Sequence, residues 1–65
     1  MPPEFTVKVH QYLYYVLATP LWSDYQYDRF CHDHGIPGGG GSDRASDYSA
    51  DVIAAAKQLM DIHGL

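Results

Sequence analysis

Four consecutive glycines after Pro37 constrain this chain more than any other feature, because glycine loses more conformational freedom on folding than any other residue. Such a run disfavours both helix and strand, so we predict a loop over residues 36–46. The letters GGGGS are also common in engineered linkers. We interpret the run as native because it joins two well-defined helical segments. The 65 residues then form a single domain, with a helical hairpin over residues 3–34 and a C-terminal helix over residues 49–63.

The spacing of apolar residues predicts a first helix over residues 3–18, which Pro20 ends. The apolar stripe of this helix consists of Phe5, Val9, Tyr12, Leu13 and Val16. The β-branched residues Thr6 and Val7 favour a strand for the first turns instead. We favour the helix because the stripe continues unbroken.

Two further helices are indicated by their capping residues. One is predicted over residues 24–34, with Ser23 and Gln26 as a capping box and Gly35 as the closing left-handed residue. The other is predicted over residues 50–63, with Ser46 or Ser49 as its N-cap and Gly64 at its end. Its apolar stripe is Val52, Ile53, Ala56, Leu59, Met60 and His63. The sequence therefore predicts an all-α fold, a small three-helix domain.

The charge balance limits the partners that this chain can have. Eight acidic residues outnumber four basic ones, for a net charge of −4, whereas a nucleic-acid-binding domain carries a basic patch. We therefore expect no direct nucleic-acid partner, and an acidic domain fits a basic protein surface better. The single cysteine, Cys31, excludes a disulfide scaffold. No signal peptide or membrane-spanning run is evident, so we expect a cytoplasmic location and no membrane partner.

The run from Tyr12 to Phe30 carries a longer pattern, YLYYVLATPLWSDYQYDRF. It combines a Tyr-Tyr-Val-Leu stretch, a proline and a Ser-Asp-x-x-Tyr-Asp-Arg element. In this it resembles the N-terminal nicotinamide-binding (Ia-like) helical subdomain of bacterial NAD-dependent DNA ligases, here freestanding and phage-like. The resemblance ends after Phe30, and nothing in the chain matches the family's nucleotidyltransferase domain with its catalytic lysine. We therefore predict no catalytic residue and no ligase activity.

The resemblance implies a site for the nicotinamide mononucleotide (NMN) half of NAD. The residues that match the family's binding positions are Tyr14, Tyr15, Asp24, Tyr27 and Asp28. Their chemistry is compatible with this role, because Asp24, Tyr27 and Asp28 share one helix face at i, i+3 and i+4. A tyrosine ring can stack on the cationic nicotinamide ring, and carboxylates can accept hydrogen bonds from ribose hydroxyls.

Aspartates at positions 43, 47 and 51 suggest a different function. If the third helix extended back to Asp43, their carboxylates would form a row about 6 Å apart that imitates a track of DNA phosphates. The alternative is an aspartate-rich helix N-terminus, which the helix dipole favours. Our first hypothesis is a non-catalytic phage or mobile-element inhibitor in a bacterial host, DNA-mimicking and similar in character to anti-CRISPR proteins. It would bind a basic nucleic-acid-binding surface of a protein complex through Asp24, Asp28, Asp33, Asp43, Asp47 and Asp51.

The alternative hypothesis is a ligase-related accessory module that binds NMN or NAD, the only case in which we expect a cofactor. A metal site is not predicted. In the run Cys31-His32-Asp33-His34, only Cys31 and His34 share a helix face, whereas structural zinc needs four converging ligands.

Overall fold

The computed structural model describes residues 1–64 of the chain. These residues form three α-helices and two short helical turns, joined by irregular segments. The elements are α1 (Pro3–Gln11), the π-turn η1 (Tyr12–Val16), α2 (Asp24–Asp33), the 3-10 turn η2 (Ala45–Asp47) and α3 (Ala50–Ile62). The prediction of an all-α, three-helix fold is confirmed, and residues 1–64 contain no strand.

α1 and η1 form one continuous helical segment that stops at Val16, two residues before the predicted end. The β-branched residues near the N-terminus lie in a helix and not in a strand. α1 begins at Pro3, directly after the extended Pro2, and proline suits the first position of a helix. At the other end, the Leu17 amide donates to the Tyr12 carbonyl at 3.2 Å, an i to i+5 hydrogen bond that defines the π-turn. Ala18 then takes a left-handed backbone conformation with φ of 51°, which ends the helical segment before Pro20.

The capping residues predicted for α2 and α3 are confirmed, although each helix ends one residue earlier than predicted, at Asp33 and Ile62. The Ser23 side chain accepts from the Gln26 amide at 3.2 Å, and the Gln26 side chain accepts from the Ser23 amide at 2.9 Å. Gly35 follows α2 with φ of 65° and Gly64 follows α3 with φ of 72°. Of the two serines considered for α3, Ser49 is the N-cap, since its hydroxyl accepts from the Val52 amide at 3.2 Å.

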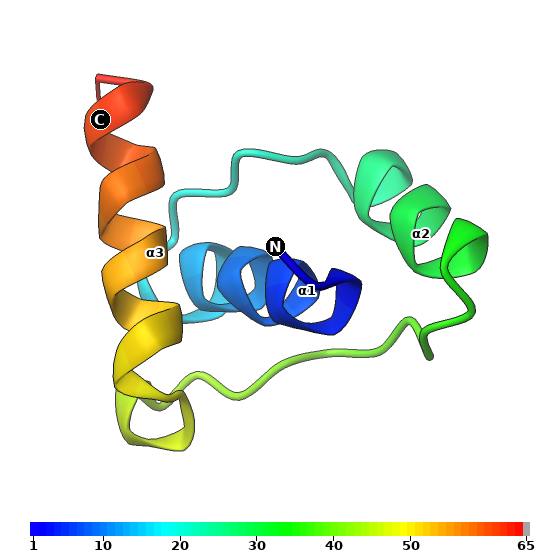
Figure 1. Ribbon diagram of the computed structural model, residues 1–65, viewed down its shortest axis with the longest axis horizontal. Helices are drawn as coiled ribbons and strands as arrows, with labels where there is room; N and C mark the ends of the chain where they lie inside the picture. The colour runs from blue at the N-terminus through cyan, green and yellow to red at the C-terminus, as the bar shows by residue number, and fades with distance from the viewer. Residues whose placement is uncertain (65) are drawn as a thin grey trace.

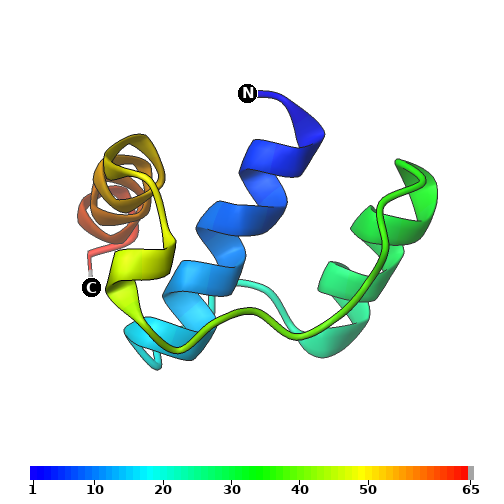
Figure 2. The same ribbon diagram turned by 90° about the horizontal axis from the view of Figure 1, so that it is seen from below.

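The hydrophobic core lies between α1–η1 and α3, not within the hairpin that α1–η1 forms with α2. Its buried residues are Val9, Tyr12, Leu13, Val52 and Ala56. Figures 1 and 2 show α1 in the middle of the molecule, with α3 on one side and α2 running back antiparallel on the other. α1 therefore has one side packed into a core and another side turned toward α2.

The glycine-rich segment passes the C-terminal end of α1 and η1 on its way from α2 to α3 (Figure 2). Residues 36–44 contain no helix or strand, and η2 occupies the end of the predicted loop. A Cβ atom on Gly41 would lie 2.9 Å from both the Cβ of Gln11 and the hydroxyl oxygen of Tyr48. That hydroxyl donates to the Ser42 carbonyl at 2.6 Å. At Gly41, the absence of a side chain is what lets the segment lie against α1.

Candidate functional site

A cleft opens on the side of α1–η1 that faces α2. Its first hollow, of about 240 Å³, lies between α1–η1 and the segment that leads into α2. The residues that line it are His10, Gln11, Tyr14, Tyr15, Pro20, Leu21, Trp22, Ser23, Asp24 and Tyr27. The second hollow, of about 260 Å³, is lined by Tyr15, Asp24, Tyr27, Asp28, Gly38 and Gly39. Because three residues line both, the two hollows adjoin and form one cleft.

Tyr14 and Tyr15 reach the cleft from the π-turn. Consecutive side chains of an α-helix point about 100° apart, whereas a π-turn is wider and rotates less per residue. Here both tyrosines line the first hollow, with ring centroids 4.8 Å apart in an edge-to-face pair. Their side chains stay accessible, at 47% exposure for Tyr14 and 39% for Tyr15. Two aromatic faces are therefore available to a flat ligand.

Tyr27 forms the wall between the two hollows, and its position is fixed from both sides. The Gln11 side-chain amide donates to the Tyr27 hydroxyl oxygen at 2.8 Å, and that hydroxyl donates to the Gly39 carbonyl at 3.1 Å. Burial raises the pKa of Tyr27 above its usual value of 10.0, so the hydroxyl keeps its proton at neutral pH. One side chain thus ties α1, α2 and the glycine segment together at the cleft.

Asp24 and Asp28 give the cleft its charge. They lie one turn apart at the start of α2, both exposed, and Asp24 lines both hollows. Within residues 1–64, the side-chain hydrogen bonds and ion pairs formed by aspartates involve Asp33 and Asp47, and none involves Asp24 or Asp28. The acceptor oxygens of these two carboxylates are therefore open to a ligand.

A stack of rings joins α1 to α2 beside the cleft. His10 lies flat on Trp22 with centroids 3.5 Å apart and an interplanar angle of 10°, and Trp22 contacts Phe30 at 4.9 Å. Burial lowers the pKa of His10 from 6.5 to about 4, so the imidazole is neutral at physiological pH. The stack closes one end of the first hollow with apolar and uncharged rings.

The structure brings together all five residues that the family resemblance assigns to nicotinamide binding. Four of them line the first hollow, and Asp28 joins the second. Sequence reasoning missed His10, although its place four residues before Tyr14 puts both on one helix face. It also missed Trp22, which stands next to the helix cap inside the family-like run. No local sequence pattern indicates that Gly38 and Gly39 line the second hollow.

The predicted row of carboxylates does not form. α3 begins at Ala50, so Asp47 lies in η2 and Asp43 in the preceding loop, and only Asp51 is on the helix. Asp47 instead accepts a hydrogen bond from the Ser42 hydroxyl. The physical reason is that Ser49 caps α3 in an extended conformation, so the α-helix does not continue back to Asp47 and Asp43.

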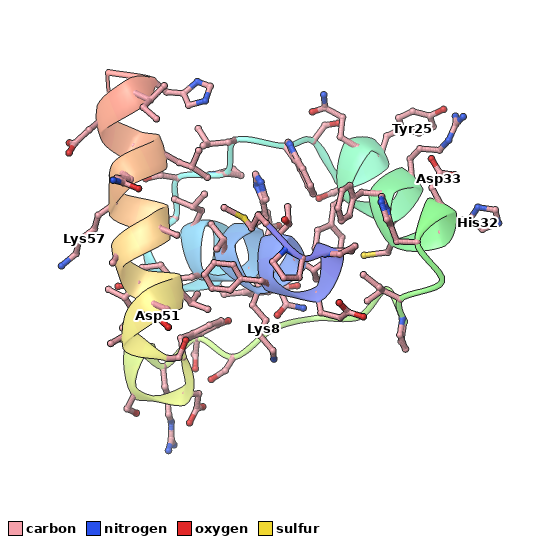
Figure 3. The ribbon with its side chains drawn as sticks, viewed as in Figure 1. Lys8, Tyr25, His32, Asp33, Asp51 and Lys57 are labelled. Carbon is pink, nitrogen blue, oxygen red and sulfur yellow. The ribbon has the colours of Figure 1, made fainter. Side chains whose placement is uncertain are left out.

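The remaining aspartates are spread over the molecule. All six of the predicted partner-binding aspartates are exposed. Asp33, at the outer end of α2, pairs with Arg29 at 3.3 Å, and Figure 3 shows Asp33 and Asp51 at opposite sides of the molecule. The structure therefore gathers two of the six, Asp24 and Asp28, into the cleft.

Residues 1–64 show neither a metal-binding cluster nor a membrane-spanning helix. No group of three or more histidine, cysteine or acidic side chains is placed so that it would hold a metal ion. None of the helices in this range combines the length and apolar character needed to cross a membrane.

The chain matches no protein-family model, no curated protein and no solved structure.

Proposed function

We propose that this chain is a non-catalytic binding module whose cleft takes the nicotinamide nucleoside part of NMN or NAD. One observation carries the proposal. The five side chains that the ligase-like pattern marks for nicotinamide, which come from η1 and α2, line a single cleft. They are separated by up to 14 positions in the sequence, so only the folded hairpin brings them together.

The size of the cleft fits a fragment rather than a whole dinucleotide. Pockets that enclose drug-sized ligands have volumes of about 300–1,000 Å³. The first hollow, at about 240 Å³, is smaller and has the dimensions for one flat ring with its substituent. The adjoining second hollow, with Asp24 and Asp28, offers acceptors to the ribose hydroxyls.

Aromatic and electrostatic contacts would supply the affinity. A tyrosine face attracts a cationic ring by about 0.5–1 kcal/mol at an exposed site. The two carboxylates add attraction for the positive charge, and His10 adds no repulsion because it is neutral. Since the tyrosines are about half exposed, we expect weak affinity, in the range of about 0.1–10 mM.

The fluorescence of Trp22, the single tryptophan, is a direct probe because this residue lines the first hollow. Titration with NMN should change its emission and shift the NMR signals of Tyr14, Asp24 and Tyr27. Tyr14→Ala should weaken binding roughly two- to fivefold through loss of a stacking face. Tyr25→Ala is the matched control, because Tyr25 lies on the outer side of α2, 70% exposed, and lines neither hollow. Absence of any cleft signal at millimolar NMN contradicts the proposal.

A second proposal, the DNA-mimicking inhibitor, rests on charge alone. The net charge of −4 and the exposure of all six aspartates favour docking on a basic surface. If this is its function, the protein competes with duplex DNA for a basic, DNA-binding protein complex of a bacterial host. Replacing Asp43, Asp47 and Asp51 together with asparagine should then reduce the competition. Competition that is absent, or that this triple variant retains in full, argues against the inhibitor.

A further inference from the structure

In the described part of the chain, the cleft combines two unpaired carboxylates with an absence of lysine and arginine side chains. Within residues 1–64, no lysine or arginine lines either hollow. Arg29 follows Asp28 directly, but its guanidinium is engaged elsewhere, 3.3 Å from the carboxylate of Asp33 and 3.3 Å from the hydroxyl of Tyr25. Lys57 projects from the outer side of α3, away from α1 and α2 (Figure 3).

Within residues 1–64, the N-terminus of α2 is the remaining feature beside the cleft that attracts anions, and two of its four free amides are already bonded. The amides of Ser23 and Gln26 are taken by the capping box. Asp24, the first residue of the helix, places its own carboxylate there and complements the helix dipole. A second anion at this place would meet that carboxylate.

His10 lines the first hollow without adding a positive charge, because burial keeps its imidazole neutral, so within residues 1–64 the α1 side of this hollow carries none. A cationic ring between the tyrosines is favoured by their faces and by Asp24. A phosphate attached to the same ligand would bring two negative charges close to Asp24 and Asp28 without a basic side chain to compensate them.

We propose that the preferred ligand of the cleft is a flat heteroaromatic cation without an anionic group, a pyridinium nucleoside such as nicotinamide riboside rather than its 5′-phosphate. This inference rests on the proposed function and reverses the order of affinity expected of a nucleotide site. Asp24 and Asp28 are the residues that set the preference. They select for the positive ring and against the phosphate.

The test compares three ligands on the full chain at low ionic strength, with Trp22 emission and NMR shifts as readouts. They are nicotinamide riboside, NMN and dihydronicotinamide riboside, the last being the reduced riboside with a neutral ring. We expect nicotinamide riboside to bind roughly three- to tenfold more tightly than each of the other two. The advantage over NMN should shrink as salt is added, because screening weakens the repulsion of the phosphate.

Asp28→Asn should reduce the preference for nicotinamide riboside over NMN, because it removes one of the two repelling charges. Asp61→Asn is the matched control, because it makes the same change of net charge at an exposed position on α3, away from the cleft. A preference that falls equally in both variants points to the overall charge of the protein and overturns the role of Asp28.

The outcomes separate this inference from the proposed function. If NMN binds in the cleft as tightly as nicotinamide riboside or more tightly, the inference is wrong and nicotinamide binding stands. If the oxidised and reduced ribosides bind equally, charge does not govern recognition and the inference is likewise wrong. If none of the three ligands changes a cleft signal, the proposed function itself fails.

Discussion

The two sides of α1 make different kinds of contact. Toward α3, the contact is a small apolar core in which Val9, Leu13 and Ala56 are completely buried. Toward α2, the contact consists of the stack of His10 on Trp22 and the hydrogen bond to Tyr27, beside an open cleft. Cys31 is the buried residue of α2. The difference indicates a division of roles, in which the α3 side supplies stability and the α2 side forms the proposed binding site.

The largest expected effect is on the core side. Leu13→Ala removes a side chain with no solvent exposure and should destabilise the protein by about 2–5 kcal/mol. A domain of this length has a total stability of about 3–10 kcal/mol, so the variant should be largely unfolded or close to it. Ile62→Ala, at a position with 76% exposure on α3, should change stability little. Urea denaturation followed by circular dichroism measures both, and equal losses would remove the distinction between core and surface.

The next effect concerns the glycine segment, which joins the two sides. Gly41→Ala would place a Cβ atom 2.9 Å from the Cβ of Gln11, which cannot move without its backbone, and should cost about 1–3 kcal/mol. Gly39→Ala meets no atom within 4 Å and should have an effect below about 0.5 kcal/mol. A loop that behaves as a free linker would tolerate both substitutions alike. Thermal unfolding of the two variants therefore decides whether this segment is part of the fold.

A smaller effect should appear on the α2 side as pH is lowered. The pKa of His10 is about 4 in the folded protein and about 6.5 unfolded, so only the unfolded chain binds a proton between these values. The stability that neutral His10 contributes is complete above pH 6.5 and is lost as pH falls toward 4. Because the ring is partly exposed, we expect a loss of about 1–2 kcal/mol.

His10→Phe keeps a ring against Trp22 and has no group that titrates in this range. Its unfolding free energy should therefore fall less than that of the wild type between pH 6.5 and pH 4. Chemical denaturation at several pH values measures the difference. Parallel pH profiles for the two proteins would show that the stack with Trp22 does not hold His10 neutral.

The smallest expected effect is at the joint between the two sides, where the helical segment ends. Ala18 is exposed and has φ of 51°, a conformation that disfavours residues with a Cβ atom. Ala18→Gly should relieve this strain and raise stability by up to about 1 kcal/mol. Thermal unfolding would show a higher midpoint, and a lower one would mean that the left-handed turn at Ala18 does not limit the stability of the folded protein.

The features that the sequence predicted correctly are the local ones. Ser23 with Gln26, Ser49, Gly35 and Gly64 mark helix ends through bonds to residues a few positions away, so their pattern is visible in the sequence. The five residues assigned to nicotinamide came from resemblance to a family and not from local signals; they line the cleft, and their role in binding stays a prediction.

The features that were missed depend on contacts between distant segments. Stacking of His10 on Trp22 and the close approach of Gly41 to Gln11 join residues 12 and 30 positions apart. The π-turn was missed because the spacing of apolar residues over a single turn does not distinguish an α-helix from a π-helix. The row of aspartates does not form because Ser49 starts α3 at Ala50, and even a cap at Ser46 would have left Asp43 outside the helix.

The π-turn at Tyr12–Val16 also bears on how such a chain can evolve. A π-turn holds one residue more than an α-turn, so a deletion of one residue within it would restore an ordinary helix. Because the wider turn takes up the extra residue, the segments on both sides of the deletion would keep their relative orientation, and the side chains within the turn would change direction. The tyrosine pair lies within the turn and would face elsewhere, while the part of the core formed by α1 ahead of the turn would keep its register. One codon lost or gained at this point is thus a short evolutionary path between a chain with this cleft and one without it.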